Sequence, residues 1–123
     1  MKLQLDKAAG FNAFTAYGDG YVSVNAVRHT GNIVVLPDRI IPGWTQSNSE
    51  SLALADFEWL ATLDDVILIL GTGRTQRFPP PELLRPLLQT GRSLEIMDIP
   101  GACRTYNILT NEGRHVAAAL LID

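Results

Sequence analysis

Residues 66–74 read Val-Ile-Leu-Ile-Leu-Gly-Thr-Gly-Arg, and this stretch decides the fold class. Its opening run of large apolar residues has no polar alternation, which favours a strand covered on both faces, as in a parallel sheet. Glycines directly after such a run are typical of a tight turn out of the strand. We therefore expect a buried strand over residues 66–70 and a turn containing Gly71, Gly73 and Arg74.

The chain beyond this turn repeats the same alternation of strand and helix. Residues 93–98 alternate as a strand does, and residues 115–122 form a last apolar strand. A helical segment opened by proline fits before each of these strands. Residues 66–122 therefore predict a β-α-β-α-β unit. Pro86 lies inside the first of these helices, where a proline removes a hydrogen bond, so we expect a kinked or shortened helix.

The first part of the chain favours antiparallel strands. The turn residues Gly18-Asp19-Gly20 separate two strand-like stretches, which predicts a β-hairpin. Residues 33–36 predict another strand, and residues 39–41 at best a short or edge strand between prolines. His29 falls in a turn of this half.

The period of the apolar residues changes near Ser47. Ser47 and Glu50 fit a capping box, in which each side chain satisfies a free backbone amide at the start of a helix. Leu52, Leu54 and Leu63 belong to apolar positions at helical spacing after it. We expect a helix from Ser47 to about Leu63.

The residue composition, net charge and cysteine count of the chain argue against several classes of function. The 123 residues, 46% hydrophobic and 19% charged, are typical of one α/β domain spanning residues 1–123. A net charge of −3, with no run of basic residues, argues against a nucleic-acid partner. Cys103 is the single cysteine, which excludes an intramolecular disulfide and a thiolate-rich metal site. We expect no cofactor and no metal.

The first residues of the sequence do not resemble a targeting segment. They have neither the long apolar core of a signal peptide nor the Arg-rich, acid-free character of a transit peptide. The longest apolar run, residues 116–122, is much shorter than the roughly 20 residues that span a bilayer. We therefore expect a soluble, cytoplasmic protein that does not span a membrane.

A binding site, if present, is expected at the carboxyl ends of the parallel strands. The residues predicted there are Gly71, Gly73, Arg74, Asp98 and Cys103. The glycines would turn backbone amides toward a small anion that the arginine grips. The alternative, which we favour, is that the glycines only allow a tight exit from the strand.

Asp98 and Cys103 also have two interpretations. Asp98 could act as a base, but a carboxylate that caps the next turn is preferred. Cys103 falls in the first turn of a helix, where its thiol would be activated. The histidine that would assist it, His115, lies at the other end of that helix, so a small buried cysteine is favoured.

Several motifs in the second half carry a resemblance to a known family. Residues 69–73 (ILGTG), 94–98 (LEIMD), 102–109 (ACRTYNIL) and 111–114 (NEGR) resemble a family of small bacterial domains of unknown function. Its eukaryotic relatives include mitochondrial complex I assembly factor 3 and the adipogenesis-associated domain protein. The likeness covers most of the chain and is strongest from about residue 64.

The resemblance implies an α/β fold with three layers. The expected architecture is a central mixed, largely parallel sheet with the C-terminal β-α-β-α-β unit and an N-terminal β-hairpin layer. The family has no established activity and no catalytic residues to carry over. Its mitochondrial members assist the assembly of a membrane enzyme.

Two functional hypotheses follow, since no motif specifies a reaction. The first is a non-enzymatic accessory or binding domain that helps to assemble a respiratory or other complex through a protein partner. The second is an enzyme for a small molecule or anion, with Arg74 as clamp, Asp98 as base and Cys103 as nucleophile. A concave pocket where these three residues converge would favour the enzyme. A filled rim beside exposed apolar side chains would favour a partner surface.

Overall fold

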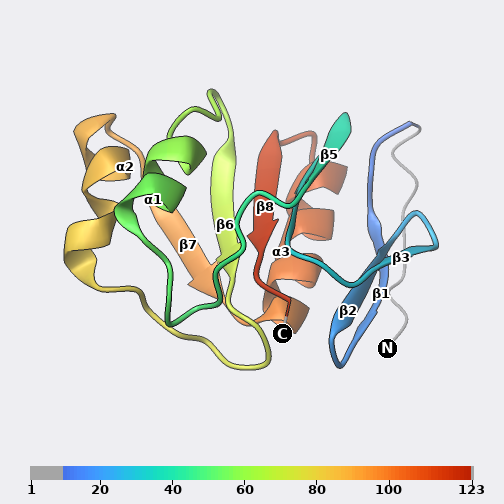
Figure 1. The fold of residues 1–123 in the computed structure, drawn as a ribbon. Coiled ribbons are helices and arrows are strands. Elements are labelled where there is room, and N and C mark those ends of the chain that lie inside the picture. The colour runs from blue at the N-terminus through green and yellow to red at the C-terminus, as the bar shows by residue number, and fades with distance from the viewer. Residues whose placement is uncertain (1–9, 123) are drawn as a thin grey trace.

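The computed structural model describes residues 10–122 and has a mixed five-stranded sheet at its centre (Figure 1). The strand order is β5-β4-β8-β6-β7. β4 pairs antiparallel with β5 and β8, whereas β6 pairs parallel with β7 and β8. The strands are β4 (Ile33–Leu36), β5 (Arg39–Pro42), β6 (Ile67–Gly71), β7 (Leu94–Met97) and β8 (Val116–Leu120).

Both faces of this sheet are covered, which gives the predicted layers. One face carries α1 (Leu54–Leu60), the 3-10 helix η1 (Pro81–Leu84) and α2 (Arg85–Gln89). The other carries α3 (Ile99–Asn111) and a second, three-stranded sheet. That sheet has the order β1-β2-β3, with β1 (Phe14–Gly18), β2 (Tyr21–Val24) and β3 (Val27–His29).

The β-α-β-α-β prediction is confirmed. β6 lies between its two parallel partners, and the connecting helices α2 and α3 cover opposite faces. The run of alanines in β8 explains how the layers come so close. Ala118 faces α3, while Ala117 and Ala119 face the α1 side, and all three are fully buried. Small side chains at these positions let a helix approach the sheet from either face.

The start of α1 differs from the expectation. The predicted capping box at Ser47 and Glu50 is wrong, because the Asn48 carboxamide oxygen accepts from the amides of Glu50 and Ser51 at 2.9 and 3.0 Å. This local turn competes with helix formation. The helix begins at Leu54, and the Asp56 carboxylate accepts from the Ala53 amide at 2.9 Å.

Three smaller predictions have clear outcomes. Leu54, expected on the buried helix face, is 45% exposed, because the helix begins there rather than about two turns earlier. Pro86 does shorten its helix: the segment divides into η1 and α2, and the proline falls in the first turn of α2. β3 was not expected, and His29 is its last residue rather than part of a turn. Its pattern of exposed residues on an edge strand explains why the sequence does not reveal it.

Candidate functional site

The carboxyl ends of β6, β7 and β8 meet at one edge of the sheet, here called the rim. Main-chain hydrogen bonds continue past the strand ends: the Thr72 amide donates to the Met97 carbonyl at 2.8 Å, and the Ile99 amide donates to the Gly73 carbonyl at 2.8 Å. The Leu121 amide likewise donates to Gly71 at 2.9 Å. The two loops that leave the rim are therefore held against each other.

Gly71 is a packing position. A Cβ on this residue would lie 2.7 Å from Leu120 Cδ2 and 3.2 Å from the Ala102 Cβ. The first distance is too short for two carbon atoms and the second is tight, so a larger residue would have to displace the Leu120 side chain and press on α3. The absence of a side chain at Gly71 thus lets the first turn of α3 rest on the strand.

Thr72 organises the loop that follows, a role that the sequence reasoning missed. Its side chain is buried; its hydroxyl donates to the Thr75 carbonyl at 2.7 Å and accepts from the Arg77 amide at 2.9 Å. Gly73 has a φ of 84°, which favours glycine at the bend. The buried Thr72 hydroxyl therefore closes the loop. The threonine is visible in the Gly-Thr-Gly motif, but the motif alone does not distinguish a loop closed in this way from an anion-binding turn.

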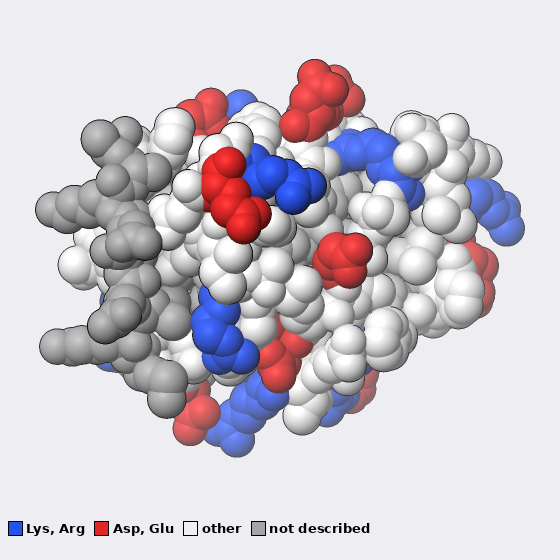
Figure 2. Space-filling model, turned by 180° about the vertical axis from the view of Figure 1, so that it is seen from behind, with Lys and Arg blue, Asp and Glu red and all other residues white. Residues whose placement is uncertain are grey.

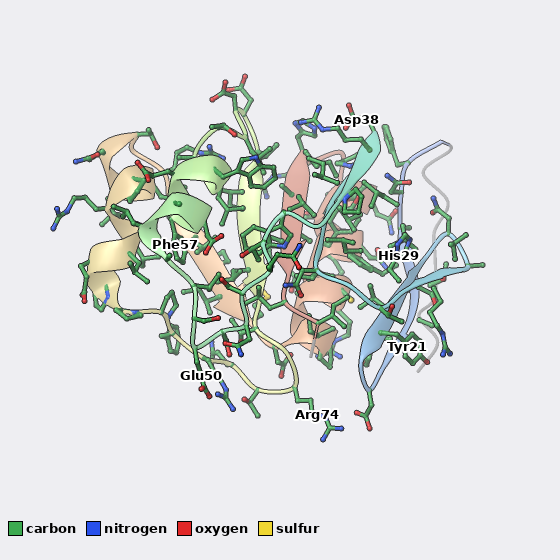
Figure 3. All side chains as sticks on the ribbon, in the orientation of Figure 1. Tyr21, His29, Asp38, Glu50, Phe57 and Arg74 are labelled. Atoms are coloured by element: carbon green, nitrogen blue, oxygen red, sulfur yellow. The ribbon has the colours of Figure 1, made fainter. Side chains whose placement is uncertain are left out.

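Arg74 is the exposed member of the loop and contacts another layer. Its guanidinium lies 3.1 Å from the Asp19 carboxylate in the turn between β1 and β2. Figure 3 places Arg74 at the same end of the molecule as Tyr21 and Glu50, and Asp38 at the opposite end. The rim therefore reaches the hairpin turn through an ion pair that spans the two sheets.

Asp98 caps α3. Its carboxylate Oδ1 accepts from the Gly101 amide at 2.7 Å, and its backbone is extended, as at an N-cap. The Ile99 amide is already bonded to Gly73, and Pro100 has no amide to offer. The helix start is therefore satisfied by the chain itself.

Cys103 lies in the core. It is fully buried between α3 and the sheet, and this burial raises the pKa of its thiol to about 12, an effect that the nearby charge of Arg104 partly offsets. A thiol with such a pKa stays protonated at neutral pH and is a poor nucleophile. His115 is at the opposite edge, where its ring Nδ1 donates to the Asp65 carbonyl at 3.2 Å. The geometry thus provides no Cys-His pair.

A cleft of about 260 Å³ opens between the rim and the hairpin turn. Its walls are residues 17–21, Gly73 and Arg74, the first turn of α3 at Ile99 and Pro100, and Ile122. Of the predicted site residues, the structure brings Gly73 and Arg74 to this cleft, whereas Gly71, Asp98 and Cys103 serve packing and capping. Asp123, which also follows the last strand, lies outside the described residues.

The hairpin layer is fastened to α3 by a buried amide. Asn107 accepts from the Phe14 amide at 2.9 Å and donates to the Phe14 carbonyl at 2.8 Å, as a neighbouring strand would. The Tyr106 hydroxyl donates to the Asn12 carbonyl at 2.9 Å. Arg104 adds a bond to the Tyr17 hydroxyl at 3.1 Å. One helix therefore positions both the rim and the hairpin wall of the cleft.

Phe78 is the most exposed of the large apolar residues that the structure describes, with 71% of its surface accessible. Its neighbours are anchored: the Arg77 backbone amide donates to the buried Thr72 hydroxyl at 2.9 Å, and the Gln76 side-chain amide donates to the Ile96 carbonyl at 2.9 Å. The Arg77 guanidinium also lies 2.7 Å from the Glu50 carboxylate, in an exposed ion pair. The aromatic ring is thus presented to solvent by a loop with a defined shape.

The face seen from behind carries charges of both signs. Arg side chains there are interspersed with Asp and Glu, without a continuous basic or acidic area among the described residues (Figure 2). Among residues 10–122 we find no group of three or more His, Cys, Asp or Glu that could hold a metal ion. No helix in the same part of the chain is long and apolar enough to cross a membrane.

The chain is similar to proteins of known sequence over most of its length. Residues 14–121 match the family described as "Protein of unknown function (DUF498/DUF598)". The bovine (Bos taurus) "NADH dehydrogenase [ubiquinone] 1 alpha subcomplex assembly factor 3" is 35% identical over 85% of this chain, which spans 60% of the bovine protein's length. The "13 kDa major membrane protein" of Francisella tularensis is 25% identical, with 98% of this chain and 99% of that protein covered.

Solved structures support the fold. The crystal structure of a Bordetella parapertussis protein has a TM-score of 0.84 and 42% sequence identity, covering 95% of this chain and all of that chain. At this identity the likeness extends from the arrangement of the elements to their sequence.

Proposed function

The chain belongs to the DUF498/DUF598 family of proteins of unknown function, and on that premise we propose that it is a non-enzymatic accessory protein that assists the assembly of NADH dehydrogenase. The similarity to the bovine assembly factor supports this role. The chain corresponds to about three fifths of that relative, so partners bound by the remainder of the bovine protein are not implied.

The exposure of Phe78 is the observation that carries the proposal. Aromatic and arginine side chains are enriched in protein interfaces, where a few such residues contribute most of the binding energy. A loop that is already held in one shape loses little further backbone freedom on binding. Phe78 is an exposed aromatic residue on a loop whose neighbouring residues Arg77 and Gln76 are hydrogen-bonded to the rest of the protein. We place the partner surface on this loop.

An enzyme at the rim receives less support from the geometry. A reaction using Arg74, Asp98 and Cys103 requires the three side chains to converge on one substrate. Cys103 is instead fully buried, and the Asp98 carboxylate is bonded to its own helix. The residues named for catalysis therefore have structural explanations.

We further propose that residues 1–123 act as one α/β domain and that the protein works in the cytoplasm, on the side where a membrane enzyme receives soluble subunits. Its partners on this proposal are proteins, and nucleic acid is not among them. A fluorescent fusion that colocalises with the periplasm or an organelle lumen would contradict the assignment to the cytoplasm.

The test is affinity capture with the tagged full chain expressed in its source organism, followed by mass spectrometry. The wild-type protein is expected to enrich NADH dehydrogenase subunits over a tag-only control. Phe78→Ser should reduce that recovery by about tenfold or more, the factor that corresponds to removing a strong interface residue. Membranes from a deletion strain should contain less assembled enzyme by native gel electrophoresis.

Ile108→Ser is the matched control. Ile108 is 59% exposed on α3, which covers the other face of the sheet, so the substitution removes similar apolar surface elsewhere. It should leave recovery unchanged. Recovery that is equal for the wild type and Phe78→Ser would refute the surface, and an absence of NADH dehydrogenase subunits would refute the assembly role.

A further inference from the structure

The cleft between the rim and the hairpin turn has the character of a small-molecule site. Its volume of about 260 Å³ is close to the lower end, about 300 Å³, of pockets that hold small ligands. It joins two different sheets and the start of α3, so its shape is defined by the tertiary fold rather than by one loop. Tyr21 and Arg74 mark its two sides in Figure 3.

The walls of the cleft are mainly apolar and aromatic. Tyr17 and Tyr21 provide rings from the hairpin, and Ile99 and Pro100 provide aliphatic surface from α3. The Tyr21 ring folds over Gly18, where a Cβ would overlap it, and the Arg28 guanidinium lies 3.9 Å from its centroid. Tyr21 is thus held in place by contacts on the hairpin. A flat or branched apolar group is the kind of ligand that such walls accept.

The charged groups that line the cleft are Asp19 and Arg74. They pair with each other at 3.1 Å, and their side chains are 83% and 74% exposed. An exposed pair of this kind contributes little, so either partner can be exchanged at small cost. Arg74 is the partner with specific chemistry, because its planar guanidinium binds a carboxylate through two parallel hydrogen bonds.

The helix start does not add a second anion-binding group. The Asp98 carboxylate occupies the amide end of α3, and the Ile99 amide is bonded to Gly73. A doubly charged phosphate would therefore meet a single arginine while facing Asp19. A monoanion fits this charge balance better.

We propose that this cleft binds a small carboxylate with an aromatic or branched apolar body. The apolar body rests against Tyr17, Tyr21 and Pro100, and its carboxylate replaces that of Asp19 on Arg74. The site is independent of the Phe78 surface, which lies outside the residues that line the cleft.

The test is an amide NMR titration of the full chain with 3-phenylpropionate. Saturable shifts are expected at the amides of Gly18, Gly20 and Gly73. Two further probes separate the parts of the ligand: 3-phenylpropanol has the ring without the charge, and propionate has the charge without the ring. Both should bind more weakly than 3-phenylpropionate.

Three variants test which charged side chain binds the carboxylate of the ligand. Asp19→Asn removes the competing carboxylate and should tighten binding about two- to fivefold, the factor that matches an exposed ion pair. Arg74→Gln should weaken binding about tenfold, as expected for losing a charged hydrogen-bonding partner. Arg114→Gln, which removes an exposed arginine just before His115 at the opposite edge, is the matched control and should change nothing.

The proposal is overturned by any of three results. These are shifts scattered over the surface without saturation, equal affinity for the neutral alcohol, and unchanged affinity in Arg74→Gln. Circular dichroism of each variant verifies the fold, and these exposed substitutions are not expected to disturb it. Capture of NADH dehydrogenase subunits is a separate readout, so failure of one proposal is distinguishable from failure of the other.

Discussion

Replacing Asn107 should detach the hairpin sheet from α3 and destabilise the whole protein. The side chain is 93% buried from solvent, at 7% exposure, and it satisfies both the amide and the carbonyl of Phe14 at 2.9 and 2.8 Å. Asn107→Ala leaves both main-chain groups without this partner. An unsatisfied buried polar group costs about 1–3 kcal/mol, so the free energy of unfolding should fall by about 2–5 kcal/mol.

The size of this loss makes the experiment decisive. For a chain of 123 residues, 1 kcal/mol corresponds to about 4 °C in Tm, so we expect a decrease of about 8–20 °C. Urea unfolding followed by tryptophan fluorescence gives the free energy. Hydrogen exchange gives the local effect, which should be a selective loss of protection at the Phe14 amide.

Asn111→Ala is the matched control, because Asn111 is the same residue type at the exposed end of the same helix. It should change the free energy of unfolding by no more than about 0.5 kcal/mol. The reasoning fails if Asn107→Ala costs less than about 1 kcal/mol, or if the Phe14 amide keeps its protection.

Three further predictions concern the rim and the core. Cys103 should react with iodoacetamide at pH 8 only after unfolding. Because the pKa of its thiol is raised from 9.0 to about 12 in the folded protein, its contribution to stability is full below pH 9 and is lost as the pH rises toward 12. The urea midpoint should therefore fall over that range more in the wild type than in Cys103→Ala. Rapid labelling of the folded protein would contradict this burial. Gly71→Ala should lower stability by about 1–3 kcal/mol, since its Cβ would overlap the Leu120 side chain and press on Ala102 of α3, and an unchanged Tm would show that these neighbours can move aside. Arg74→Ala should change Tm by only a few degrees, because its ion pair with Asp19 is exposed, and a large loss would identify it as structural.

The elements that the sequence predicts well are those with local signals. The apolar run before Gly71 identifies β6, and the prolines in the first turns of η1 and α3 mark where these helices begin. Hairpin β1–β2 follows from the turn at Gly18-Asp19-Gly20. These signals depend on residues within a few positions of each other, so no knowledge of the tertiary structure is needed to interpret them.

The failures have two physical sources. At Ser47 and Glu50, a neighbouring Asn48 offers the amides a better acceptor, so local competition decides against the helix. The site depends instead on distant contacts: Arg74 and Asp19 are far apart in sequence, and no local pattern connects them. The packing of Asn107 on Phe14, which supports the cleft, is another contact of this kind.

The burial of Cys103 could have been predicted from the spacing of apolar residues in the sequence. Ile99, Cys103, Tyr106 and Thr110 follow the spacing of a helix face, and all are buried. That periodicity identifies the side of α3 that meets the sheet. Proximity to the helix start alone suggests a reactive thiol, whereas the position around the helix axis decides that it is covered.

The position of β8 has a consequence for synthesis. β8 is the last strand described, yet it lies between β4 and β6. Before it emerges from the ribosome, β4 and β6 each present an unpaired apolar edge, of the kind that recruits strands from other chains. At about 5–20 residues per second, β4 waits several seconds for its neighbour. Nascent or prematurely terminated chains that lack Val116–Leu120 are therefore the form of this protein most exposed to aggregation, and the form for which chaperones matter most.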